Sequence, residues 1–301
     1  MMIRRLKDMF SVLKSSPGRQ LVVAYAHDAH TLAAVREAVS MGIVKATLTG
    51  DEQSIREICK MEKIDPGIFD FASAADEQQA ASLAVSLVKS GQGDLIMKGT
   101  VSTDRYMRAI LSKEHGILPP GALLTHVSVL DPVKYKKLLI IGDVAIIPLP
   151  GLKEKQVILN ALISTAHSLG IQNPKVAVIA ATEQALPGMP ACIDAAVLSK
   201  MAERGQFKNA IVEGPVALDV ALDTESAKIK KINTPVAGDA DCLLFPNIES
   251  GNVFYKCHTK LLEGDVAAIV CGASVPAVLS SRGDSIRTKL FSIALAAMMT
   301  L

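Results

Sequence analysis

Short apolar runs alternate with longer amphipathic stretches along most of the chain. Nine of the short runs predict β-strands, over residues 21–26, 46–49, 95–97, 138–141, 144–147, 176–181, 210–212, 243–245 and 267–271. Between them, apolar residues recur at helical spacing and predict helices over residues 30–41, 75–90, 103–112, 152–169, 190–203, 251–262 and 285–299. A strand that is repeatedly followed by a helix predicts mainly parallel sheets with helices on both faces.

The number of predicted strands bears on the domain organisation. Nine strands are many for one open sheet, so we predict an α/β protein of two Rossmann-like lobes with mainly parallel sheets. The proline-rich segment Pro148-Leu149-Pro150-Gly151 marks the expected break, which gives a first lobe over residues 1–147 and a second over 148–279. The last helix, within residues 280–301, is expected to return to the first lobe. On such sheets ligands bind where the strands end.

Composition and charge narrow the functional classes. Half of the 301 residues are hydrophobic and the formal net charge is +2, which does not favour nucleic-acid binding through bulk charge. The five cysteines are scattered without a C-x-x-C pair, which favours reduced thiols in the cytoplasm over disulfides or a zinc site. Charged residues interrupt the N-terminal apolar positions, and no run is long enough to span a membrane, so neither a signal peptide nor a membrane partner is expected.

The segment Leu279-Ser280-Ser281-Arg282-Gly283-Asp284-Ser285 is the strongest candidate for a site. It follows the apolar run that ends near Val270 and precedes the last predicted helix. The start of a helix favours anions through its free N–H groups and its dipole. The guanidinium of Arg282 adds a planar fork that can hold two oxygens of a phosphate. We therefore predict an anion site at this turn.

Two other polar turns follow predicted strands. Lys98-Gly99-Thr100-Val101-Ser102-Thr103 precedes the helix that contains Arg105 and Arg108, and its glycine, hydroxyls and lysine suit an anion. The spacing of a Walker motif is absent, and an ordinary turn with Thr103 as the N-cap explains this segment equally well. In the second turn, Asn247, Gly251 and Asn252 open a helix that carries Tyr255 and Lys256. A cap from Ser250 or Asn252 is the structural alternative there.

For five other polar residues, a structural role explains the sequence at least as well as a functional one. Asp219 suits a helix cap or an ion pair, and Asp143 follows a glycine in what reads equally well as a tight turn. His27 and His30 lack the spacing of a helical metal pair, while Asp28 between them suits an N-cap. No metal site is predicted.

Taken together, these segments resemble the phosphate acetyl/butyryltransferase family over nearly the whole chain. The resemblance rests on Asn247-x-x-x-Gly251-Asn252-x-x-Tyr255-Lys256 and Ser281-Arg282-Gly283. Further segments are most similar to the butyryl branch: Lys98-Gly99-Thr100 with Arg108-Ala109, Met189-Pro190-Ala191, Glu213-Gly214-Pro215 with Leu218-Asp219, and the run from Lys289 to Ala296.

The resemblance implies an activity and a set of site residues. The expected reaction is acyl-CoA plus phosphate giving acyl phosphate plus CoA, with no permanently bound cofactor, in a cleft between the lobes of a homodimer or higher homo-oligomer. It places the serine at Ser281 near the CoA thiol and the arginine at Arg282 on the phosphoryl group. The predicted substrate-binding residues are Lys98, Thr100, Ser102, Thr103, Arg108, Asn247, Gly251, Asn252, Tyr255, Lys256 and Gly283.

The chain departs from this family pattern at one position. Acetyltransferases of the family carry an aspartate seven residues after the serine, as the base for the thiol, whereas this chain has Thr288. Our hypothesis is that Asp284, the nearest carboxylate, replaces that base. The alternatives are a phosphate acetyltransferase, a binding protein without catalysis, and an NAD- and metal-dependent dehydrogenase of similar layout, for which the chain lacks a D-x-x-x-D set in a predicted helix.

Overall fold

The computed structural model describes residues 2–281 and 283–301, so the predicted phosphate ligand Arg282 lies outside the described residues. The chain forms two compact units. We call Leu6–Leu124 with Ala267–Leu301 the terminal unit, and Thr125–Val266 with the residues up to Arg5 the central unit. None of the helices in the described part of the chain combines the length and the apolar character that crossing a membrane requires.

The terminal unit contains six strands in the order β3-β2-β1-β4-β11-β10. Its strands pair in parallel except β10 with β11, which pair antiparallel. The strands are β1 (Arg19–Ala24), β2 (Val44–Gly50), β3 (Asp70–Ser73), β4 (Leu95–Lys98), β10 (Asp265–Cys271, from Ala267 on within this unit) and β11 (Ala277–Val278). Its helices are α1 (Asp8–Lys14), α2 (Ala29–Ser40), α3 (Glu52–Met61), α4 (Glu77–Lys89), α5 (Thr103–Leu111) and α11 (Ile286–Met298), with the 3-10 turn Pro66–Ile68.

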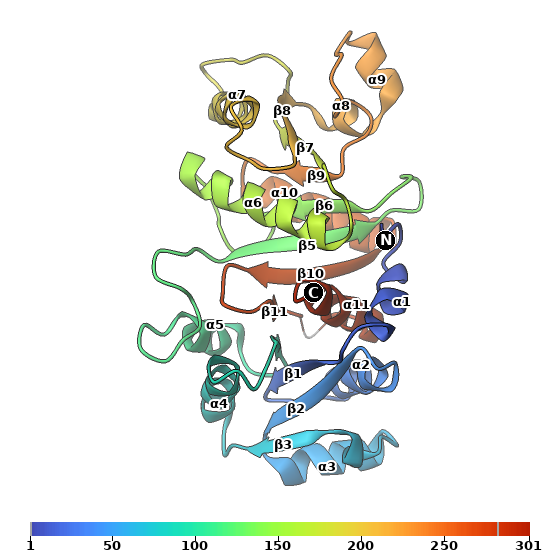
Figure 1. The fold of residues 1–301 in the computed structure, drawn as a ribbon, viewed down its shortest axis with the longest axis vertical. Coiled ribbons are helices and arrows are strands. Elements are labelled where there is room, and N and C mark those ends of the chain that lie inside the picture. Colours follow the sequence, from blue (N-terminus) through green and yellow to red (C-terminus); the bar gives the residue numbers. More distant parts are fainter. Residues whose placement is uncertain (1, 282) are drawn as a thin grey trace. The chain divides into compact units, whose positions relative to one another are not determined.

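Helix α11 lies in the interior of the terminal unit. Every residue from Lys289 to Met298 is buried, so the helix packs on all sides rather than along one stripe. The ring of Phe291 stacks on Phe10 of α1 at 5.5 Å, and Figure 1 shows the two helices side by side. Burial on all sides ties α11 to the first part of the chain and fixes the turn that precedes it.

The central unit contains five strands in the order β5-β6-β9-β7-β8 (Figure 1). The pair β5–β6 is antiparallel and the others are parallel. The strands are β5 (Thr125–Asp131), β6 (Leu139–Gly142), β7 (Lys175–Ile179), β8 (Ile211–Val216) and β9 (Cys242–Leu244). The helices are α6 (Leu152–Ser168), α7 (Pro190–Glu203), α8 (Leu218–Leu222), α9 (Thr224–Ile229) and α10 (Ile248–Lys256), which continues as the π-helix Cys257–Leu261.

The structure confirms the α/β class with mainly parallel strands flanked by helices. One predicted strand, 144–147, is wrong. The carboxylate of the buried Asp143 accepts the N–H groups of Ala145 at 2.7 Å and Ile146 at 2.9 Å, so these groups are not available to a β-ladder. Strands β3, β5 and β11 and helices α3, α8 and α9 were not among the predicted elements.

The units divide at positions other than the expected break at Pro148. Residues 125–147 lie in the central unit, because β5 pairs with β6 and β6 pairs with β9. The other change of unit lies between Val266 and Ala267, within β10, so the terminal unit is built from two separate stretches of chain that include α11. The proline-rich segment is instead the connection between β6 and α6 inside the central unit.

Candidate active site

The carboxyl ends of β1, β4 and β11 lie at one edge of the sheet in the terminal unit. β4 is parallel to both neighbours, with Ala24 opposite Lys98 and Val278 opposite Met97. Polar residues follow each of these strands, at 25–28, 98–102, and 280–281 with 283–285. The sheet therefore brings together two of the segments that the sequence predicts for anion binding, at the edge where ligands bind to parallel sheets.

The turn after β4 is fixed to the end of β1. The N–H of Gly99 donates to the carbonyl of Ala24 at 2.9 Å, and both the N–H and the hydroxyl of Thr100 donate to the carbonyl of Tyr25, at 2.9 and 3.1 Å. A Cβ at position 99 would lie 2.3 Å from that carbonyl oxygen, so the close approach requires glycine. The ammonium of Lys98 is buried and donates to the carbonyl of Gly99 at 3.0 Å.

Ser102 is the N-cap of helix α5. Its hydroxyl accepts the N–H of Arg105 at 3.4 Å, so the alternative that Thr103 is the N-cap is wrong. The carboxylate of Glu77 accepts the N–H of Ser102 at 3.0 Å and also pairs with the guanidinium of Arg105. Thr103 is the first helical residue and is exposed. Arg105 therefore joins α5 to α4, while Thr103 remains accessible at the edge of the sheet.

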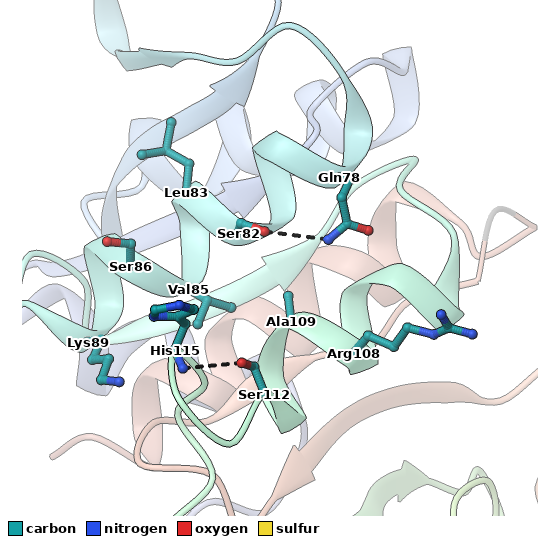
Figure 2. Close-up of a pocket in the computed structure, with 10 residues that line it drawn as sticks. All are labelled: Gln78, Ser82, Leu83, Val85, Ser86, Lys89, Arg108, Ala109, Ser112 and His115. Atoms are coloured by element: carbon teal, nitrogen blue, oxygen red, sulfur yellow. Dashed lines mark hydrogen bonds between the residues drawn. The ribbon is translucent and has the colours of Figure 1, made fainter.

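Arg108 lines a groove between α4 and α5. The groove has a volume of about 550 Å³, and Figure 2 shows the cationic side chains of Lys89 and Arg108 on opposite sides of it. Arg108 donates from Nε to Asp104 at 3.0 Å, but its side chain is 76% exposed. The remaining lining is mostly polar, with Gln78, Ser82, Ser86, Ser112 and His115 beside Leu83, Val85 and Ala109. An exposed guanidinium in a polar groove suits an anionic ligand.

The turn at Ser281 is closed by hydrogen bonds within itself. The N–H of Ser281 donates to the carboxylate of Asp284 at 2.7 Å, and the N–H of Asp284 donates to the carbonyl of Ser281 at 3.2 Å. The hydroxyl of Ser281 accepts the N–H of Gly283 at 3.3 Å, and Ser281 is exposed. The geometry thus presents a hydroxyl to solvent on a turn whose backbone is fixed on both sides.

Lys289 is a site residue that was not predicted from the sequence. Its side chain is buried, and Nζ donates to the hydroxyl of Ser280 and to the carbonyl of Ser281, both at 3.1 Å. Burial lowers the pKa of Lys289, and the carboxylates of Asp28 and Asp284 oppose that shift. In the sequence, Lys289 stands out as the one charged residue in the run 289–299. The segments that resemble the family include Lys289, but the resemblance assigns it no role.

Thr288 takes part in the N-cap of α11. The hydroxyl of Ser285 accepts the N–H of Thr288 and donates to its hydroxyl, both at 3.1 Å. The position where the family pattern has an aspartate is thus occupied by a side chain that stabilises the helix start. Asp284 lies one residue before the cap, and its carboxylate faces the backbone of Ser281.

The second predicted group lies in the central unit, around helix α10. Asn247 caps this helix and accepts the N–H of Ser250 at 3.0 Å, which rules out the alternative caps Ser250 and Asn252. A Cβ at Gly251 would lie 2.6 Å from the carbonyl oxygen of Asp143, so glycine allows the helix to approach that turn. The amide of Asn252 donates to the carbonyl of Val144 at 3.0 Å.

Tyr255 and Lys256 lie on the last turn of α10. Tyr255 is half-buried and packs against the core of the central unit, while Lys256 is exposed with its ammonium 5.1 Å from the Tyr255 ring centroid. The predicted residues therefore form two groups. The terminal unit holds Lys98, Thr100, Ser102, Thr103, Arg108, Ser281, Gly283 and Asp284, and the central unit holds Asn247, Gly251, Asn252, Tyr255 and Lys256.

The weaker candidates have structural roles. Asp143 accepts four hydrogen bonds, from Ala145, Ile146, the hydroxyl of Thr125 and the N–H of His126, the last two at 2.9 Å. Its carboxylate is therefore committed to holding the turn after β6.

Asp219 and Asp28 also have structural roles, in an ion pair and in a helix cap. Asp219 pairs with Lys230 at 3.0 Å, and hydrogen bonding from this ammonium lowers the pKa of Asp219. Asp28 caps α2, as predicted. In the described part of the chain, no three His, Cys, Asp or Glu side chains are grouped so that they could hold a metal ion.

Comparison with known proteins identifies the family. The family model described as phosphate acetyl/butaryl transferase matches residues 68–297. The chain belongs to this family. The resemblance seen in the sequence is thereby confirmed. Membership of this family excludes the alternative of an NAD- and metal-dependent dehydrogenase.

Relatives with named activities lie in both branches of the family. A phosphate butyryltransferase from Clostridium acetobutylicum is 44% identical over 298 residues, which cover 99% of each chain. A phosphate acetyltransferase from Rhizobium meliloti is 39% identical over 277 residues, 92% of this chain and 87% of the relative. The crystal structure of a branched-chain phosphotransacylase from Enterococcus faecalis is 27% identical, with a TM-score of 0.82 over 94% of this chain and 99% of that one. These phosphate acyltransferases match almost the full length of the chain.

Proposed function

We propose that this protein is a phosphate acyltransferase that exchanges a short-chain acyl group between CoA and inorganic phosphate, with butyryl-CoA preferred over acetyl-CoA. One observation carries the proposal. The exposed hydroxyl of Ser281 lies on a turn held by Asp284 and Lys289, at the sheet edge where β4 and β11 end. The 44% identity to a phosphate butyryltransferase supports the choice of acyl group.

The chemistry requires charge to be stabilised at two points. When phosphate attacks the thioester carbonyl, negative charge develops on the carbonyl oxygen, and the C–S bond then breaks to release CoA. Preorganised donors lower such barriers. We propose that the hydroxyl of Ser281 donates to this oxygen or to the departing sulfur. Arg282, which the sequence places directly after Ser281, would hold two phosphate oxygens with its guanidinium.

The reverse direction needs a base, since the thiolate is the nucleophile. Asp284 is our candidate: its carboxylate belongs to the same turn as Ser281 and has one oxygen within 2.7 Å of the Ser281 nitrogen. Thr288, which occupies the family's aspartate position, bears no carboxylate and is engaged in the cap of α11. We therefore propose that Asp284 takes the proton of the CoA thiol, after which the thiolate attacks the acyl phosphate and phosphate leaves.

The remaining predicted residues are proposed to bind the rest of the substrates. The exposed guanidinium of Arg108 suits a phosphate group of CoA, and Thr100, Ser102, Thr103 and Gly283 contribute polar groups on the turns of the terminal unit. Lys98 adds positive charge at the end of β4. In the central unit, Asn247, Gly251 and Asn252 shape the start of α10, and Tyr255 and Lys256 present the side chains that we propose for binding.

The setting of the enzyme is also part of the proposal. We propose that the CoA thioester is a substrate rather than a resident cofactor, and that the protein is a homodimer or larger homo-oligomer in the cytoplasm. The five cysteines are all free, which fits a reducing compartment. Light scattering coupled to gel filtration measures the mass of the assembly, and a monomer would contradict the oligomer.

A thiol-release assay tests the proposed activity. Purified protein is mixed with butyryl-CoA or acetyl-CoA, with and without phosphate, and free thiol is followed. We expect phosphate-dependent release and a higher kcat/KM for butyryl-CoA; the two extra methylenes are worth about 1–3 kcal/mol each. A faster reaction of acetyl-CoA would identify an acetyltransferase. Bound CoA without thiol release would indicate a binding protein and contradict the proposal.

A further inference from the structure

Lys289 is a buried cation to which the proposed reaction steps assign no role of its own. It is 2% exposed and begins a run of ten buried residues in α11. A charged group in such a run has a large desolvation cost unless strong hydrogen bonds compensate. The same helix position would accept leucine or methionine for packing alone. The presence of an ammonium group therefore needs an explanation in terms of what it contacts.

The two contacts of the ammonium are both on the backbone segment that carries the catalytic hydroxyl. Nζ donates to the hydroxyl of Ser280 and to the carbonyl of Ser281, each at 3.1 Å. The Ser280 hydroxyl in turn donates to the carbonyl of Lys98 at 3.5 Å. Lys289 thus connects α11, the turn after β11 and the end of β4, which are the three elements that form this edge of the site.

The opposite side of the same turn is held by a carboxylate. Asp284 accepts the N–H of Ser281, while Lys289 donates to the C=O of the same residue. The N–H and the C=O of Ser281, which lie on either side of its Cα, are therefore each hydrogen-bonded to a charged side chain. Hydrogen bonds that involve a charged partner are about twice as strong as neutral ones and fix geometry more tightly. Both hydrogen-bond acceptors of Lys289 are neutral, and the nearby charges that act on its ammonium are the carboxylates of Asp28 and Asp284.

We propose that Lys289 is a positioning residue of the acyl-transfer site: it fixes the orientation of the Ser281 hydroxyl and places a positive charge beneath the turn that receives phosphate. The inference rests on the proposed function. Loss of Lys289 leaves the Ser281 carbonyl without this donor, and the turn then samples other orientations. Both the chemical step and the affinity for phosphate are affected, because the hydroxyl is misplaced and the local positive charge is gone.

Lys289→Met tests this proposal, since methionine approximates the length and volume of the lysine stem and removes the donors and the charge. Lys155→Met is the matched control. Lys155 is also buried, lies on α6 in the central unit and pairs with Asp194 at 2.6 Å. Both variants are assayed for kcat, for KM of phosphate and of butyryl-CoA, and for thermal unfolding. Ser280→Ala, which removes one acceptor only, is measured alongside them.

We expect Lys289→Met to lower kcat and raise the KM of phosphate, with a combined loss of about ten- to a hundredfold in kcat/KM for phosphate. The KM of butyryl-CoA should change less than twofold. Ser280→Ala should change the same constants in the same direction. The logarithm of its loss in kcat/KM for phosphate should be about a third of that for Lys289→Met. Lys155→Met should lower the unfolding temperature and leave the kinetic constants of the folded protein within twofold of the unmodified enzyme.

The outcomes separate the inference from the proposed function. If the unmodified enzyme releases no thiol in response to phosphate, the proposed function fails and the inference fails with it. If the unmodified enzyme is active and Lys289→Met matches it in kcat and in the KM of phosphate, only the inference is overturned. Should Lys289→Met not fold, Ser280→Ala and Lys289→Arg decide. Wild-type kinetics in Ser280→Ala would overturn it, and so would a loss of about a hundredfold or more in kcat/KM for phosphate in a normally folded Lys289→Arg.

Discussion

The N–H of Ser281 donates to the carboxylate of Asp284, three residues later, at 2.7 Å. This bond holds the turn closed, and its acceptor is also the carboxylate that we propose as the base for the CoA thiol. A structural role and a catalytic role therefore fall on the same side chain, and they predict different consequences of substitution.

Asp284→Asn separates these roles, because the amide oxygen can still accept the Ser281 N–H while the basic group is lost. We expect kcat in the direction of acyl-CoA formation to fall by about 10²- to 10⁴-fold, with CoA affinity nearly unchanged. A kcat near that of the unmodified enzyme would leave Asp284 as a turn residue only.

Arg282→Ala should remove the group that we expect to hold phosphate. Loss of one preorganised donor from such a site costs about 3–4 kcal/mol in the barrier, so turnover should fall by at least two orders of magnitude. The KM of phosphate should rise more than that of butyryl-CoA. Circular dichroism and thermal unfolding establish that the variant is folded. Kinetic constants close to those of the unmodified enzyme would remove Arg282 from the site.

Gly99→Ala tests how tightly the turn after β4 packs on β1. The added Cβ would lie 2.3 Å from the carbonyl oxygen of Tyr25, and backbone has to move to relieve the contact. We expect a loss of about 1–3 kcal/mol in the free energy of unfolding, measured in urea. Gly188→Ala is the control, since nothing lies within 4 Å of a Cβ there. Equal stabilities of the two variants would contradict the packing argument.

The ion pairs of Asp239 with three lysines predict that the stability of the fold depends on pH. Partial burial would raise the pKa of Asp239, but hydrogen bonds from Lys136, Lys175 and Lys137 outweigh it and hold the pKa well below the usual range of an aspartate. A carboxyl whose pKa is lower in the folded state stabilises the fold above the unfolded pKa, and this contribution is lost as the pH falls through the folded pKa.

Asp239→Asn should therefore lower the free energy of unfolding at pH 7, by about 1–3 kcal/mol for a carboxylate with several ammonium partners. The difference from the unmodified protein should shrink as the pH falls below about 4, the ordinary value for aspartate. Urea unfolding at a series of pH values measures it, with the exposed Asp70→Asn as the control. A difference that is constant with pH would contradict the ionic origin.

The alternation of strands and helices is the part of the fold that could be predicted well from the sequence. Short apolar runs such as 95–97 and 176–181 are typical of buried strands, and they correspond to β4 and to β7, which ends at Ile179. Strand β5 escaped detection because Thr125, His126 and Ser128 interrupt its apolar pattern, although all three are buried. The hydroxyl of Thr125 and the N–H of His126 bind Asp143, a residue distant in sequence, so the compensation for their burial is not visible locally.

The site shows the same division between local and distant information. The turn at Ser281 was predicted because its residue types and its place before a helix are local properties. The role of Lys289 depends on which backbone atoms its ammonium reaches after α11 has packed, and eight residues separate it from Ser281. Likewise, Gly99 is required by the carbonyl of Tyr25, which directly follows another strand, β1. Contacts of this kind follow from tertiary packing and not from spacing.

The construction of the terminal unit from two stretches has a consequence for synthesis on the ribosome. Leu6–Leu124 is translated first, but β10, β11 and α11 are made only after the whole central unit. Until then the apolar faces of α1 and α2 that α11 covers remain without their partner, and the edge of β4 that pairs with β11 stays open. The nascent chain is therefore expected to need protection from aggregation at this stage and to acquire activity only when its last helix docks.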